Sequence, residues 1–171
     1  MFSQYYIFGL FVFFVIILVM SFCYSFLIRK QNKRIRSSIL QGKFIHASVF
    51  EKNWISAKHK NKGIAGYKYN DTSGCYVILF FDQLVTDNNF RDFENIYIGQ
   101  SVKICQRVHN HFTGKGKGDV YADIKYGKQA YVQFVPCPKS DMNKVEKELI
   151  KIFNAQKSYN NTRGGGAIRY N

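Results

Sequence analysis

The N-terminal stretch most strongly limits how this 171-residue chain can fold, because residues 1–28 contain no charged side chain. From Tyr5 to Ile28 almost every residue is apolar or aromatic. As an α-helix rising about 1.5 Å per residue, that segment would span roughly 36 Å, and the hydrocarbon core of a bilayer is about 30 Å thick. The sequence therefore predicts a transmembrane helix over residues 1–28, which contacts the membrane through residues 5–28.

A cleaved signal peptide is the alternative interpretation of this stretch. No Lys or Arg precedes it, the apolar segment is longer than a signal peptide requires, and no small-x-small cleavage site follows. Basic residues crowd its C-terminal end instead, and basic flanks normally stay in the cytoplasm. We therefore expect a single-pass membrane protein whose C-terminal part lies in the cytoplasm. These flanking residues are Arg29, Lys30, Lys33, Arg34 and Arg36.

The net charge of +14 and the pI of about 9.7 indicate a polyanionic partner, either nucleic acid or an anionic lipid surface. Residues 29–72 are basic and mostly lack a clear hydrophobic period, so we interpret them as a basic juxtamembrane linker. The alternative is an amphipathic extension of the helix into the membrane interface through Ile35, Ile39, Leu40, Phe44 and Ile45. Within residues 29–72, the basic residues from Lys52 to Lys68 lie among the aromatic residues Trp54, Tyr67 and Tyr69, a pattern that suits nonspecific nucleic-acid contact and equally a solvated linker. The four cysteines lack the spacing of a zinc site.

Two short tyrosine-containing segments mark the start of a folded domain. Gly74-Cys75-Tyr76 opens a continuous β-prone run that ends at Phe81, and Tyr97-Ile98-Gly99 closes a second run. A continuous run of this kind indicates a strand buried on both faces. A third run extends from Ala130 to Val135. We therefore predict an α+β fold with a small three-stranded sheet, mixed or antiparallel, flanked by helices.

The first predicted helix carries two polar residues on one face. Ser101 can cap a helix that runs to about Phe112, with Val102 on its apolar face. Arg107 and His111 are four residues apart, so they share another face and can reach one ligand together.

The last predicted helix begins at Asp141 and places Glu146 beside its apolar stripe. A carboxylate in that position is costly unless a cation or hydrogen bonds satisfy it. Glu146 is therefore either a metal ligand or a structurally paired residue, whereas Glu148 falls on the solvated side.

The order and types of these residues resemble the GIY-YIG nuclease superfamily over about residues 73–165. The resemblance implies a GIY-YIG-like nuclease domain over residues 73–171 that hydrolyses phosphodiester bonds of nucleic acid, with DNA as the expected substrate. It also implies that Glu146 binds one Mg²⁺ or Mn²⁺. The catalytic residues that it implies are Tyr76, Tyr97, Arg107, His111, Glu146 and Asn160.

The chain departs from the family pattern at two points. The two tyrosines are twenty-one positions apart, which is wider than usual and implies a lengthened hairpin loop. Gln100 stands where many relatives have lysine.

The segment Thr113–Gly118 lacks the spacing of a phosphate-binding P-loop. We interpret it as a basic loop that contacts the nucleic-acid backbone or as a plain linker. Lys103, Lys115 and Lys117 are the expected nucleic-acid-binding residues. Two alternatives to an endonuclease are a noncatalytic, membrane-tethered nucleic-acid-binding protein and a membrane protein whose resemblance to a nuclease is accidental.

Overall fold

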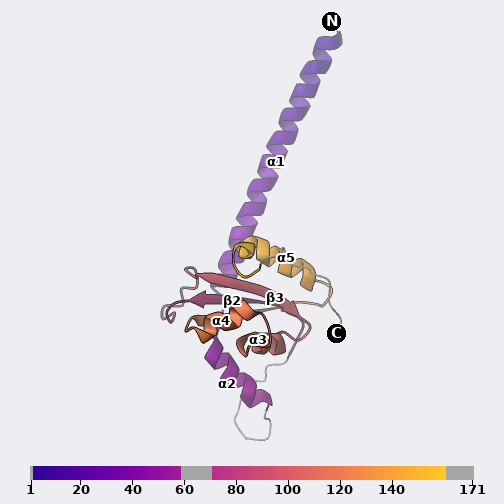
Figure 1. The fold of residues 1–171 in the computed structure, drawn as a ribbon. Coiled ribbons are helices and arrows are strands. Elements are labelled where there is room, and N and C mark those ends of the chain that lie inside the picture. The colour runs from indigo at the N-terminus through magenta and orange to yellow at the C-terminus, as the bar shows by residue number, and fades with distance from the viewer. Residues whose placement is uncertain (1, 59–70, 161–171) are drawn as a thin grey trace. The chain divides into compact units, whose positions relative to one another are not determined.

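A computed structural model describes residues 2–58 and 71–160 of the chain (Figure 1). It divides into two compact units, residues 1–38 and residues 39–171. Part of the basic and aromatic stretch that was predicted to suit nucleic-acid contact, residues 59–70, lies outside the described residues, as does the C-terminal segment 161–171.

The first unit consists of helix α1 (Phe2–Leu40) up to residue 38. Its apolar part is long and apolar enough to cross a membrane, as expected from the absence of charge before Arg29. Large apolar side chains such as Phe14 and Leu18 are exposed along it. The helix continues without a break past Ile28 through the basic residues to Leu40, because nothing after Ile28 interrupts it: the segment contains no proline or glycine.

The described part of the second unit, residues 39–58 and 71–160, contains one antiparallel sheet of four strands rather than the three expected. The prediction missed β1, which pairs Ile45 with Val132 and His46 with Tyr131. A strand of two residues is too short to show the alternation that reveals longer strands. The strands lie in the order β1-β4-β2-β3, with β1 at Ile45–His46, β2 at Gly74–Phe81, β3 at Asn95–Ser101 and β4 at Gln129–Pro136.

Both faces of the sheet are covered by helices (Figure 1). Every residue of β2 is buried, as the continuous apolar run predicted. Cys75, Val77 and Leu79 pack on one face with α5 (Met142–Phe153). The alternate residues of β2 pack on the other face, where the helices are α2 (Ala47–Lys58), α3 (Ile104–Phe112) and α4 (Gly118–Lys125).

Part of the region interpreted as a linker contributes to this core. Leu40 is buried in the cluster beside α5. Phe50, on α2, is fully buried on the opposite face and packs edge-on against Phe112, with ring centroids 5.7 Å apart. The folded unit thus begins well before residue 73.

Helix α3 begins later than the sequence suggested. Ser101 ends β3, and its hydroxyl accepts a hydrogen bond from the N–H of Lys103 rather than capping a helix directly. The carboxylate of Asp71 accepts the N–H of Cys105 at 2.9 Å, so a residue from outside the helix satisfies its first turn. Val102 therefore lies before the helix and is exposed, which corrects its predicted place on the apolar face.

Candidate functional site

The two motif tyrosines lie on the same face of the sheet. Tyr76 in β2 is paired with Gly99 in β3, and Tyr97 is paired with Ile78. Their ring centroids are 6.2 Å apart. The long loop between β2 and β3 does not disturb this register, so the wide separation of the tyrosines in sequence leaves them adjacent in space.

Gly99 makes the position of Tyr76 possible. A Cβ atom at residue 99 would collide with the phenol of Tyr76. Tyr76 is 1% exposed and Tyr97 is partly exposed, so the two phenols have different access to solvent.

His111, on α3, is fully buried and fixes the phenol of Tyr76. Its Nε2 lies 2.8 Å from the Tyr76 oxygen. Its Nδ1 accepts the backbone N–H of Lys117 at 2.7 Å. Because a backbone N–H can only donate, the neutral ring carries its proton on Nε2 and donates it to Tyr76.

The environment of His111 keeps the ring neutral. Burial, together with the smaller effect of the nearby positive charges of Arg107 and Lys117, lowers the pKa of His111 to about 3. Gly116 leaves room for the ring, because a Cβ atom at that residue would collide with it. The glycine-rich loop after α3 therefore positions His111 in addition to carrying basic residues.

Arg107 is exposed on α3 and acts electrostatically on both phenols. Burial raises the pKa of Tyr76 well above its usual value, and the neighbouring Tyr97 adds to that shift. Burial likewise raises the pKa of Tyr97. In both cases the positive charge of Arg107 acts in the opposite direction and favours the phenolate.

Glu146, on α5, is half-buried and lies close enough for its charge to act on the same phenols. Burial is the main reason that the pKa values of Tyr76 and Tyr97 are raised, and the negative charge of Glu146 raises both further. One carboxylate oxygen, Oε2, accepts a hydrogen bond from Nε2 of Gln100 at 3.0 Å. Glu148, two residues further along α5, is exposed as predicted.

Asn160 hydrogen-bonds to the backbone of β3, the strand that carries Tyr97. Its side-chain oxygen accepts the N–H of Ile98 at 2.8 Å, and its side-chain nitrogen donates to the carbonyl of Ile98 at 2.6 Å. Ile98 lies between Tyr97 and Gly99 in the edge strand β3. Asn160 therefore satisfies the open edge of the strand that carries Tyr97.

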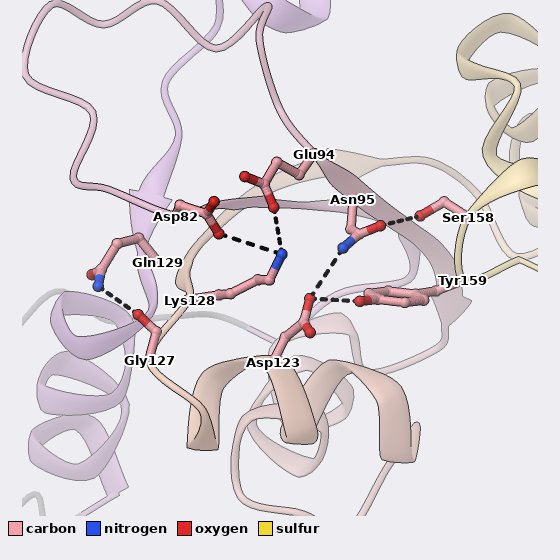
Figure 2. Close-up of polar contacts among 9 residues, drawn as sticks. All are labelled: Asp82, Glu94, Asn95, Asp123, Gly127, Lys128, Gln129, Ser158 and Tyr159. Atoms are coloured by element: carbon pink, nitrogen blue, oxygen red, sulfur yellow. Dashed lines mark hydrogen bonds and ion pairs between the residues drawn. The ribbon is translucent and has the colours of Figure 1, made fainter.

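A polar network holds the segment that carries Asn160 (Figure 2). The hydroxyl of Tyr159 donates to the carboxylate of Asp123, on α4, at 2.6 Å. Asn95 approaches the same oxygen at 3.5 Å and accepts the hydroxyl of Ser158 at 3.4 Å. Sequence reasoning missed Asp123, since only the packing of α4 brings it near residue 159.

Figure 2 also shows an ion-pair cluster at this end of the sheet. The ammonium group of Lys128 lies 3.5 Å from the carboxylate of Asp82 and pairs with Glu94. These contacts tie the start of β4 to both ends of the loop between β2 and β3.

The three lysines predicted to bind nucleic acid lie around α3. Lys103 is the residue just before the helix, and Lys115 is in the loop after it; both are exposed. Lys117 is partly exposed, and its ammonium group pairs with Asp119 at 3.2 Å.

The predicted metal ligand is a single carboxylate. Within residues 2–58 and 71–160, no three His, Cys, Asp or Glu side chains gather in a way that could hold a metal ion. The Oε1 atom of Gln100 is nevertheless buried next to this carboxylate without a hydrogen-bond partner among the described residues. One carboxylate and one buried acceptor fit a cation such as Mg²⁺, which keeps several of its own waters.

The site thus brings together five of the six predicted catalytic residues through β2, β3, α3 and α5, while Asn160 braces β3. In the sequence, Gln100 stands out only as a departure from the family pattern. It directly follows Gly99, and the two-residue period of a strand would have placed its side chain on the α5 face. Comparison with protein-family models, curated proteins and solved structures found no match to this chain.

Proposed function

We propose that this protein is a membrane-anchored, metal-dependent endonuclease of the GIY-YIG type that hydrolyses phosphodiester bonds of nucleic acid, with DNA as the substrate. The observation that carries the proposal is the convergence of two tyrosines, an arginine, a buried histidine and a carboxylate from distant parts of the chain. Supporting contacts are the 2.8 Å hydrogen bond between Tyr76 and His111 and the charges of Arg107 and Glu146 acting on both phenols. Side chains that only packed together would not require the positive charge of Arg107 and the negative charge of Glu146 beside the phenols.

Each residue has a chemical task in this proposal. Glu146 would hold Mg²⁺ or Mn²⁺, which would supply Lewis-acid stabilisation of the phosphate and of the leaving oxygen. Arg107 is exposed and forms no ion pair with a carboxylate in residues 2–58 and 71–160, so it can bind the scissile phosphate and offset the charge of the transition state.

A phenol orients the attacking water and accepts its proton. An ordinary tyrosine has a pKa of about 10, so it needs nearby positive charge to act as a base near neutral pH. Arg107 supplies such charge to both phenols. His111 assists by donating from Nε2 to Tyr76, which stabilises a phenolate rather than removing its proton.

The remaining surface suits a nucleic-acid substrate at a membrane. Lys103 and Lys115 are exposed at the two ends of the helix that carries Arg107, where they can contact phosphates. Helix α1 anchors the protein, and the basic residues after Ile28 favour a cytoplasmic location of the folded unit.

The test is incubation of the full-length protein, solubilised in detergent, with supercoiled plasmid and with single-stranded DNA and RNA. Parallel reactions contain Mg²⁺ or a chelator. Cleavage only with Mg²⁺ supports the enzyme, and the substrate that is cut identifies the nucleic acid. Retention of nucleic acid without cleavage in Mg²⁺ would instead support the noncatalytic tether.

A further inference from the structure

The side chain of Gln100 links β3 to α5 directly at the predicted metal ligand. Its Nε2 donates to Glu146 Oε2 at 3.0 Å and to Asn143 Oδ1 at 2.6 Å. Asn143 and Glu146 are three residues apart on α5, so they occupy neighbouring positions on one side of the helix. One amide therefore holds two successive turns of α5 against the sheet.

Hydrogen-bond chemistry determines which way this amide faces. An ionised carboxylate can only accept, so the nitrogen of Gln100 must face Glu146. Both protons on that nitrogen are then used, one by each acceptor. The oxygen, Oε1, is left buried without a partner among the described residues. A buried acceptor without a hydrogen-bond partner is destabilising, so its retention beside a carboxylate calls for a partner that binds there.

We propose that Gln100 is a positioning residue for the metal site, a role that rests on the proposed function. Through Nε2 it holds Glu146 in the orientation that binds the cation. Through Oε1 it accepts a hydrogen bond from a water molecule in the cation's hydration shell. Outer partners of this kind orient metal ligands, and their loss typically weakens metal affinity about 10–100-fold.

The alternative is that Gln100 only fastens α5 to the sheet. The two roles differ in what they predict for metal affinity. A fastening role would make Asn143 as important as Glu146, because both accept from the same nitrogen. A metal-site role makes the contact with Glu146 and the acceptor Oε1 the important features, and leaves Asn143, which is exposed, dispensable.

The experiment measures Mn²⁺ binding to the full-length protein in detergent by electron paramagnetic resonance of the free ion. Gln100→Met keeps the length of the side chain but removes both hydrogen-bonding groups. We expect it to lower Mn²⁺ affinity about tenfold. We expect Asn143→Ala to bind within about twofold of the wild type and Glu146→Gln to lose the site, as removal of a ligand should. Plasmid cleavage by Gln100→Met should recover towards the wild-type rate when Mn²⁺ is raised.

One further measurement and one substitute variant keep the outcomes distinct. Thermal unfolding without metal, followed by Trp54 fluorescence, shows whether each variant folds. If Gln100→Met does not fold, Gln100→Asn replaces it, because that amide is one methylene too short to reach Glu146 and should show the same loss. Wild-type Mn²⁺ affinity in a folded Gln100 variant, with Glu146→Gln still defective, would overturn the role of Gln100 alone. Absence of any Glu146-dependent Mn²⁺ binding in the wild type would overturn the proposed function and this inference together.

Discussion

Gly99 lies directly opposite Tyr76 in the β2–β3 ladder, and the phenol of Tyr76 occupies the space into which a side chain at residue 99 would project. This relationship gives a physical reason for the glycine at the end of the second tyrosine segment. The phenol can reach His111 only because the neighbouring strand presents no side chain at that point.

Replacement of Gly99 by alanine should displace the Tyr76 phenol. We expect Gly99→Ala to lower the free energy of unfolding by about 1–3 kcal/mol, because it overpacks a filled site. Cleavage should fall with it, since Tyr76 and His111 lose their alignment. Unfolding can be followed by the fluorescence of Trp54, the only tryptophan in the chain.

Gly118→Ala is the matched control for this substitution. Gly118 begins α4, and a Cβ atom there would meet nothing within 4 Å. The same chemical change should therefore leave stability unchanged or slightly raised. Equal losses in both variants would show that the effect does not depend on Tyr76.

The neutral state of His111 predicts how stability depends on pH. Its pKa is about 3 in the folded protein, against an ordinary value of 6.5, because of burial and then the charges of Arg107 and Lys117. Between pH 6.5 and 3 the unfolded chain binds a proton at this ring that the folded chain does not. Folding stability should therefore decrease on acidification through this window, by up to about 1.4 kcal/mol per pH unit from His111.

The comparison of wild type with His111→Gln isolates this contribution, because all other titrating groups are shared. Between pH 7 and pH 4.5, the midpoint temperature of unfolding should fall further in the wild type than in His111→Gln. Parallel pH profiles would contradict the assignment of a buried, neutral His111.

Removing the hydroxyl of Tyr76 or of Tyr97 should affect the free energy of unfolding differently, while both changes should reduce cleavage. Tyr76→Phe removes the acceptor of the buried His111 Nε2–H and should cost about 1–3 kcal/mol of stability. Tyr97→Phe should cost less, since this residue is partly exposed. Both should reduce Mg²⁺-dependent cleavage, and the phenol that accepts the water proton should show a loss of about 10²–10⁴-fold. Wild-type rates in both variants would remove the tyrosines from the mechanism.

Asn160 should contribute to the stability of β3 rather than take part in the reaction. Asn160→Ala leaves the N–H and the carbonyl of Ile98 without their partner, so we expect a loss of about 1–3 kcal/mol. Gln156→Ala, an exposed change in the same C-terminal segment, should stay within about 0.5 kcal/mol of the wild type. A neutral Asn160→Ala would mean that the edge of β3 does not need this amide.

The sequence alone predicted the elements whose residues form a clear hydrophobic pattern or a regular spacing. The apolar run from Tyr76 to Phe81 predicted a strand buried on both faces, and the uncharged N-terminus predicted the long apolar helix. The spacing of Arg107 and His111 predicted two residues on one helix, which is where they lie.

Features that depend on contacts between distant segments could not be read from local pattern. Strand β1 is defined only by its pairing with β4. The start of α3 is set by Asp71, more than thirty residues away from the N–H that it accepts. The contact of Gln100 with Glu146 requires the packing of α5 on the sheet as well as the register of β3.

The most direct test of the account is Mg²⁺-dependent plasmid nicking by full-length Glu146→Gln and Glu148→Gln, measured side by side with the wild type. Both variants remove one negative charge from α5, but Glu146 is half-buried beside Gln100 whereas Glu148 is exposed. We predict that Glu146→Gln abolishes nicking while the protein stays folded, and that Glu148→Gln nicks at the wild-type rate. Full activity of a folded Glu146→Gln variant would contradict the proposed metal-dependent nuclease site.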